Sequence, residues 1–292
     1  MSWQFVLTGL LIGTLVGLTG MGGGSLMTPI LVILFGFKPT LAVGTDIAHG
    51  AIFKTIGALR HRRLGTVHQQ LSGWMFLGSG PASIGGVVLG THLKDQQGLM
   101  GYVLGGALLF GACGLVAKSL IRAKTIGEVF DMARRDRIAA VAIGLVGGFI
   151  VGLTSVGSGT FFGLTMLFVF PLRAHKVVGT DIMHAAALLY VAGFGHFVAG
   201  NVDMSVVGWL LIGSIPGVLI GSHYSVRLPE STLRLTLASV LALSGLKLVD
   251  VPTVYLAVGL GLVVALVAVM LVRAQRQWQA QRLAAEALTS PD

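Results

Sequence analysis

The chain has 292 residues, of which 54% are apolar and only 11% are charged, and its mean hydropathy is +0.87. Soluble domains carry about 25% charged residues, so this composition excludes an ordinary soluble protein and indicates an integral membrane protein. The net charge of +9 comes from basic residues in short loops beside apolar segments. Such residues set membrane orientation, so we expect a lipid bilayer and no nucleic acid as partner.

The apolar residues fall into successive stretches separated by short charged or Gly/Pro loops. Stretches of about 15 to 24 residues predict helices and not the alternating strands of a barrel. We therefore expect an all-α polytopic membrane protein with 8–11 apolar segments. The stretches cover residues 3–19, 22–36, 41–60, 70–93, 98–121, 138–154, 157–171, 176–198, 205–226, 234–249 and 252–272.

Two parts of the chain repeat each other at an offset of 135 residues. Residues 17–93 overlay residues 152–228 without a gap, and 23 of the 77 positions are identical. The matches include polar and aromatic residues, such as Trp74 with Trp209, so shared hydrophobicity alone does not explain them. We infer an internal duplication of a membrane unit.

The distribution of Lys and Arg predicts how the two copies are oriented. Placing alternate loops and the tail in the cytoplasm gives 15 basic residues on that side and two, Lys38 and Lys94, on the other. By the positive-inside rule, equivalent loops then lie on opposite sides, so the repeats are inverted and the C-terminus is cytoplasmic. We expect a first membrane repeat at 1–121, a cytoplasmic connecting loop at 122–137, a second, inverted repeat at 138–250, an additional transmembrane helix at 251–272 and a cytoplasmic tail at 273–292.

Each repeat opens with two apolar stretches joined by a glycine-rich turn. The later stretch of each pair has 15 residues and would rise only about 22 Å, against a hydrocarbon core of about 30 Å. We therefore expect a broken-helix hairpin in each repeat, and about 7 full spans plus two hairpins in all. The two turns, named the first tip (Gly20 to Ser25) and the second tip (Ser155 to Thr160), should lie inside the membrane and line a cavity.

Helix N-termini at the two tips predict an anion site, because their N–H groups and positive dipole ends would converge in a medium of low dielectric constant. The alternative is that the glycines only allow helices to pack closely. The candidate substrate-binding residues are Thr19, Gly22, Gly24, Ser25, Thr45, Thr154, Gly157, Ser158, Gly159, Thr160 and Thr180.

The motif Gly-Thr-Asp-Ile occurs at Gly44 and again at Gly179, each time inside an apolar stretch and followed by a histidine. On a helix, Asp46 and His49 share a face, as do Asp181 and His184. Ionisable residues in such stretches are candidates for proton coupling. The structural alternative is that each aspartate fastens a loop or caps a neighbouring helix.

Lys54 has no basic counterpart, because Leu189 occupies the equivalent position in the second repeat. Lys54 falls about six residues before the cytoplasmic end of its helix, within reach of water for a long side chain. We therefore expect it to snorkel to the interface and not to bind a ligand.

The chain resembles the TauE/SafE family of membrane transporters, often called sulfite exporters. The resemblance covers essentially the whole chain and implies a carrier in the bacterial inner membrane for sulfite, sulfoacetate or other small organosulfonates. It rests on GLTGMGGGSLMTP, GTDIAH, GLTSVGSGT, VGTDIMH, GHFVAGNVD and GSIPGVLIGS.

These observations predict a secondary transporter of a small anion that works by alternating access, with no cofactor and no metal. A passive anion channel is the alternative, and an intramembrane hydrolase is a weaker one, since the chain has no H-E-x-x-H or G-x-S-x-G pattern. The absence of a Walker A motif argues against ATP as a direct energy source. The sequence does not predict the oligomeric state.

Overall fold

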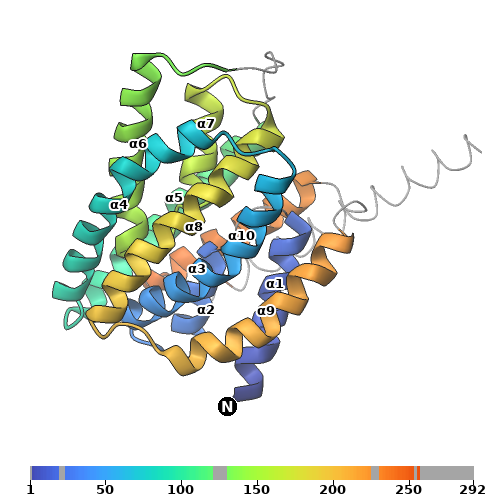
Figure 1. Cartoon of the computed structure of the whole chain (residues 1–292). Helices are drawn as coiled ribbons and strands as arrows, with labels where there is room; N and C mark the ends of the chain where they lie inside the picture. The colour runs from blue at the N-terminus through green and yellow to red at the C-terminus, as the bar shows by residue number, and fades with distance from the viewer. Residues whose placement is uncertain (1, 20–23, 121–129, 225–229, 253–254, 257–292) are drawn as a thin grey trace, which may run out of the picture.

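The computed structural model of this chain describes residues 2–19, 24–120, 130–224, 230–252 and 255–256 (Figure 1). Helices joined by short turns make up this described part, which confirms the all-α fold class. The helices are α1 (Ser2–Thr19), α2 (Gly24–Ile33), α3 (Pro39–Arg63), α4 (Gln69–His92), α5 (Gln97–Leu120), α6 (Arg134–Thr154), α7 (Phe161–Val169), α8 (Ala174–Val198), α9 (Met204–Tyr224) and α10 (Glu230–Leu248).

Four of the described helices are long and apolar enough to cross a membrane, and they lie in α5, α6, α8 and α9. Shorter apolar segments occur at Ser2–Gly17 in α1 and Leu237–Leu248 in α10. The total of about seven spans therefore stays a prediction. The predicted helix at 251–272 and the tail at 273–292 fall almost wholly outside the described residues.

The later helix of each predicted hairpin is short. With 10 residues in α2 and 9 in α7, these helices rise only about 15 Å and 14 Å, roughly half the hydrocarbon thickness of a bilayer. Between α6 and α7 the chain turns through residues 155–160. This geometry agrees with the broken helix expected from the short second stretch.

The connecting segment is shorter than its sequence suggests. Residues 121–129 lie outside the described part, and Arg134 to Arg137 form the first turn of α6 and not the end of a loop. Asp136 stabilises this helix start, because its Oδ2 accepts a hydrogen bond from the N–H of Ala133 at 2.9 Å.

The helices pack in reciprocal pairs between the two repeats. An offset of 135 residues relates α1 to α6 and α4 to α9, and the structure pairs α1 with α9 and α4 with α6 (Figure 1). The remaining long helices pair with their own equivalents, α3 with α8 and α5 with α10. Each repeat thus contributes one helix to every major pair.

Small residues bring the reciprocal pairs into close contact. A Cβ atom at Gly148 of α6 would overlap the backbone of Ser79 in α4, and one at the equivalent Gly13 of α1 would overlap the backbone of Ser214 in α9. Glycine is therefore required where the two backbones touch, as is common between membrane helices. The packing alternative stated for the glycines holds at these positions.

The central helices α3 and α8 run in opposite directions. Gly44, near the start of α3, lies beside His196 near the end of α8, whereas Gly57, near the end of α3, lies beside Ile182 near the start of α8. Because α3 and α8 are equivalent in the two repeats, these equivalent elements are antiparallel at the centre of the molecule.

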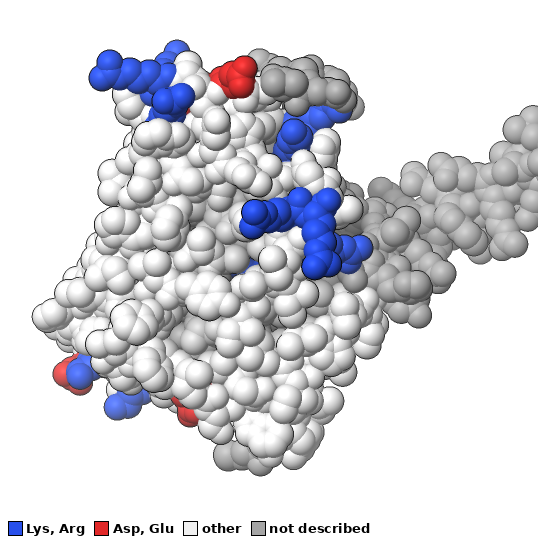
Figure 2. All heavy atoms as spheres, in the orientation of Figure 1, with Lys and Arg blue, Asp and Glu red and all other residues white. Residues whose placement is uncertain are grey.

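Most of the face in view in Figure 2 carries no charged side chain. Figure 2 shows basic groups over the upper part of the face in view, with a few charged groups at its lower edge. Exposed apolar side chains of the described residues include Leu77, Phe194 and Ile212. A surface of this kind suits a lipid environment.

Candidate functional site

The two Gly-Thr-Asp-Ile motifs lie in the first half of α3 and of α8. All four polar side chains that follow the glycines, namely Thr45, Asp46, Thr180 and Asp181, are buried. Both motifs therefore face the protein interior and not the lipid.

The two threonines hold the starts of helices from the other repeat. Thr45 Oγ1 accepts a hydrogen bond from the N–H of Asp203 at 3.1 Å, directly before α9. Thr180 Oγ1 accepts one from the N–H of His68 at 2.9 Å, directly before α4. Because helix starts carry N–H groups without a helical partner, these contacts stabilise the junctions. Each threonine thus fastens a helix, and the prediction that both bind substrate stays a prediction.

The two histidines form a second reciprocal pair of contacts. His49 Nε2 lies 2.9 Å from Ser214 Oγ in α9, and His184 Nε2 lies 2.8 Å from Ser79 Oγ in α4. All four side chains are buried. The histidines thus join each central helix to the reciprocal helix pair beside it.

Asp46 connects both hairpins to α3. Its Oδ2 accepts hydrogen bonds from the hydroxyl groups of Thr28 in α2, at 2.5 Å, and of Ser155 in the second tip, at 2.9 Å. The positions equivalent to these donors in the other repeat are Gly163 and Gly20, which carry no hydroxyl group. The two aspartates therefore have different surroundings, despite their identical motifs.

Lys54 is buried, with 3% of its surface exposed, and its Nζ donates a hydrogen bond to Ser158 Oγ at 2.7 Å. The expectation that Lys54 snorkels to the interface is therefore wrong. Both Asp46 and Asp181 lie near enough to interact electrostatically with its ammonium group. An ionisable side chain buried in this way is costly inside a membrane protein, which makes Lys54 a candidate functional residue.

The second tip is an irregular turn enclosed by protein, since every residue from Thr154 to Thr160 is buried. Gly157 and Gly159 have φ angles of +118° and +100°. Residues with side chains rarely adopt these values, so both glycines are needed for the backbone conformation. Burial of the turn agrees with the rule that irregular backbone at membrane depth must be surrounded by protein or water.

The hydroxyl groups of this tip differ in what they contact. Thr154 Oγ1 donates to the carbonyl oxygen of Ile150 at 2.7 Å and accepts from the N–H of Val156 at 3.2 Å. Thr160 Oγ1, in contrast, is buried and has no hydrogen-bond partner within the described residues. The unsatisfied hydroxyl of Thr160 is therefore available to a ligand.

The N–H groups at the start of α7 are less available than the sequence suggests. Those of Phe161 and Phe162 lie 3.0 Å and 3.4 Å from the carbonyl oxygen of Gly157, to which they donate. The side-chain donors beside this turn are the ammonium group of Lys54 and the hydroxyl groups of Ser158 and Thr160.

The first tip lies largely outside the described part of the chain. Gly22 is among the residues left out, and α1 ends at Thr19 and α2 begins at Gly24, as predicted for this hairpin. The side chains of Thr19 and Ser25 are likewise not described. Their part in an anion site stays a prediction.

The described core contains donors for an anion and several ionisable groups, but no group of His, Cys, Asp and Glu that could hold a metal ion occurs among its described residues. Ionisable side chains buried between long apolar helices are typical of membrane transport proteins. The geometry therefore defines a helical membrane protein with a polar centre built by both repeats.

The chain belongs to the family described as sulfite exporter TauE/SafE, whose sequence model matches residues 5–248. It is similar to the probable membrane transporter protein YjnA of Bacillus subtilis (strain 168), with 40% identity over 257 residues, 85% of this chain and 100% of that protein. The probable membrane transporter protein y4hK of Sinorhizobium fredii is 31% identical over 222 residues, 74% of this chain and 85% of the relative. No solved structure matches the chain.

A more distant relative, the probable membrane transporter protein YdhB of Bacillus subtilis (strain 168), is 25% identical over 245 residues, 83% of this chain and 98% of that protein. Family and relatives together indicate a multi-pass membrane transporter and not an enzyme.

Proposed function

We propose that this protein is a secondary transporter of a small anion, sulfite or an organosulfonate, that works by alternating access in the bacterial inner membrane. The observation that carries the proposal is the buried Lys54, whose ammonium group binds Ser158 in the second tip. The substrate class rests on the family, whose description names sulfite.

The chemistry of the tip suits an oxyanion. The ammonium group of Lys54 has three N–H donors and uses one for Ser158, so further donors remain for substrate oxygens. Thr160 adds a hydroxyl group that lacks a partner in the described structure. Charge-assisted hydrogen bonds in a buried site are about twice as strong as neutral ones, so this cluster would bind a compact anion.

An inverted arrangement of the repeats gives the transporter its mechanism. The antiparallel course of α3 and α8 supports it, because equivalent helices run in opposite directions across the site. In such a molecule the two halves can rock against each other around a fixed central site, opening it first to one side and then to the other. The distribution of Lys and Arg supports a cytoplasmic position for the C-terminal tail.

Proton coupling is assigned to the carboxylates and imidazoles of α3 and α8, namely Asp46, His49, Asp181 and His184. Entry of an anion beside buried aspartates is unfavourable unless charge is balanced, and uptake of a proton with the anion provides that balance. The different surroundings of the two aspartates support a division of roles, in which Asp46 holds the hairpins and Asp181 exchanges the proton.

Flux into proteoliposomes tests the function directly. Purified protein is reconstituted and the uptake of sulfite, sulfoacetate and chloride is compared with and without an imposed pH gradient. The proposal predicts that sulfite or sulfoacetate accumulates above equilibrium and that a protonophore abolishes the accumulation. If the anions only equilibrate across the membrane and the pH gradient has no effect on their uptake, the protein is an anion channel. Absence of flux for both sulfur anions would refute the assigned substrate class.

A further inference from the structure

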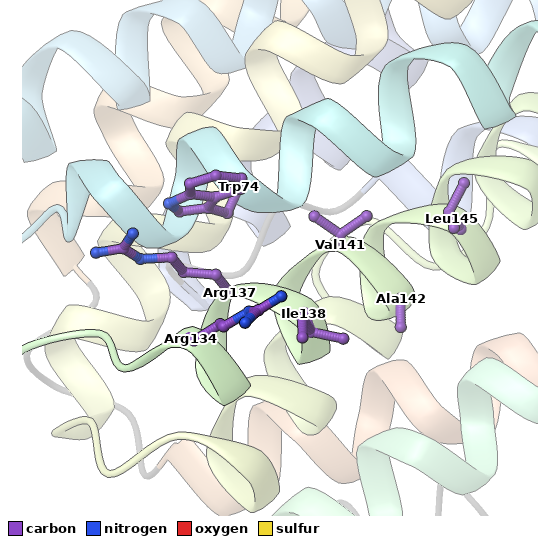
Figure 3. Close-up of a pocket in the computed structure, with 7 residues that line it drawn as sticks. All are labelled: Trp74, Arg134, Arg137, Ile138, Val141, Ala142 and Leu145. Carbon is purple, nitrogen blue, oxygen red and sulfur yellow. The ribbon is translucent and has the colours of Figure 1, made fainter.

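A groove opens on the surface between α4 and α6, away from the central site. It has a volume of about 620 Å³ and is almost wholly apolar along its length (Figure 3). Its lining residues are Trp74, Arg134, Arg137, Ile138, Val141, Ala142 and Leu145.

The groove has a charged end and an apolar end. Figure 3 shows Arg134, Arg137 and Trp74 at one end, with the two guanidinium groups pointing in different directions, and Leu145 at the other. The 12 residues of α6 from Arg134 to Leu145 span about 16 Å, which is comparable with an extended lipid chain. Apolar side chains one or two turns apart, including Ile138 and Ala142, lie between the two ends.

The two arginines are well placed to bind an anion. Both side chains are exposed, and the guanidinium carbon of Arg137 lies 5.7 Å from the centre of the Trp74 ring, so the ring orients it. No acidic residue lines the groove within the described structure. The neighbouring Asp136 instead caps its own helix through the N–H of Ala133.

The corresponding surface in the other half lacks this cation. At the repeat offset of 135 residues, Arg137 of the second repeat is equivalent to Ser2 of the first. Trp74 of the first repeat is equivalent to Trp209 of the second. The aromatic side chain is therefore present in both halves, whereas the arginine is present in one. The basic groove belongs to the end of the molecule that the Lys and Arg count places in the cytoplasm, where membranes expose anionic lipids.

We propose that this groove is a binding site for an anionic glycerophospholipid of the cytoplasmic leaflet. Its phosphate lies at the end of the groove that Arg134 and Arg137 line, where an exposed guanidinium group forms charge-assisted hydrogen bonds with phosphate oxygens. One acyl chain follows the apolar side chains toward Leu145. Bulk lipid would cover any apolar face without preference, but two arginines in a groove that no described acidic residue lines select a headgroup of net negative charge over a zwitterionic one.

Native mass spectrometry of the detergent-solubilised full chain tests the selectivity. The probe is an equal mixture of phosphatidylglycerol and phosphatidylcholine with identical acyl chains. The unaltered protein should retain phosphatidylglycerol over phosphatidylcholine by about tenfold, and the double variant Arg134→Gln/Arg137→Gln should lose that preference. Arg135→Gln is the control for loss of a positive charge, because it removes one such charge from the same turn of α6 without lining the groove, and it should keep the preference.

A second variant tests the apolar half of the site. Ala142→Trp fills the middle of the groove without changing charge, so it should lower retention of phosphatidylglycerol while the protein still elutes as a single species. Excess glycerol 3-phosphate, which has the headgroup chemistry but no chains, should not displace the lipid. Three results would each overturn the proposal. The unaltered protein could retain the two lipids equally, or the double variant and Arg135→Gln could lose the preference for phosphatidylglycerol to the same extent. Displacement of the lipid by glycerol 3-phosphate would be the third.

Discussion

Lys54 of the first repeat donates a hydrogen bond to Ser158 of the second, at 2.7 Å, and both side chains are buried. The bond joins the centre of α3 to the turn that precedes α7. The histidine contacts around it are symmetric, since His49 with Ser214 and His184 with Ser79 repeat the same geometry at 2.9 Å and 2.8 Å. The molecule thus combines a symmetric frame with an asymmetric charged centre.

The first prediction concerns the charge of Lys54. Lys54→Met keeps an unbranched chain of similar length but removes the ammonium group, so anion uptake should fall at least about tenfold, as expected for the loss of a charged interaction of about 1.5–3 kcal/mol. Initial rates of sulfite uptake into proteoliposomes measure the effect.

Leu189→Met is the matched control for this experiment, since it places the same side chain at the equivalent position of α8. Its rate should stay within about twofold of the unaltered protein, because Leu and Met exchange at little cost in a core. Equal uptake by the Lys54→Met variant and the unaltered protein would remove Lys54 from the anion site.

The second prediction concerns the backbone of the second tip. Gly157 has a φ angle of +118°, so Gly157→Leu introduces strain on the order of 1–3 kcal/mol and should abolish transport while leaving membrane insertion intact. Gly208→Leu provides the comparison, because a Cβ atom at that helical position meets open space. Normal uptake by the Gly157→Leu variant would show that the tip conformation is not needed for function.

The third prediction separates the two aspartates. Asp181→Asn should flatten the pH dependence of sulfite uptake, because the amide cannot exchange a proton at this position. Asp95→Asn, which changes an exposed loop residue, should leave the pH profile as it is. A profile in the Asp181→Asn variant that still follows pH would show that the proton travels by another group.

The fourth prediction concerns the reciprocal threonines. Thr45→Val and Thr180→Val each remove the acceptor for one N–H group, at Asp203 and at His68. Each change should destabilise the protein by about 1 kcal/mol. Thermal unfolding in detergent, followed by size-exclusion chromatography, should show similar shifts for the two variants. A shift in only one of them would contradict the equivalence of the two junctions.

Much of the arrangement of the helices was predictable because the chain contains the same sequence pattern twice. The offset of 135 residues identifies helices that the structure places in equivalent positions, and it anticipated the broken pair α6 and α7. The reciprocal packing of α1 with α9 and of α4 with α6 was not predicted, because hydrophobicity does not specify which apolar faces meet. Those choices depend on close contacts such as Gly148 with Ser79.

The position of Lys54 was predicted incorrectly, for a physical reason. A lysine about six residues from a helix end can reach water, and distance along the chain does not reveal which face it occupies. The repeat contained the missing signal, because the equivalent residue is Leu189, which is 2% exposed and packs in the core. A basic residue aligned with a buried leucine is expected to point inward.

The proposed transport mechanism depends most on the inverted orientation of the two repeats, which face each other around the anion. Gln69 and Met204 are equivalent, exposed residues at the starts of α4 and α9, so each can be changed to cysteine after Cys113→Ser has removed the natural thiol. A membrane-impermeant maleimide applied to right-side-out and to inside-out vesicles then reports the side of each residue. The account predicts that Gln69→Cys is labelled only in inside-out vesicles and Met204→Cys only in right-side-out vesicles, and labelling of both from the same side would contradict it.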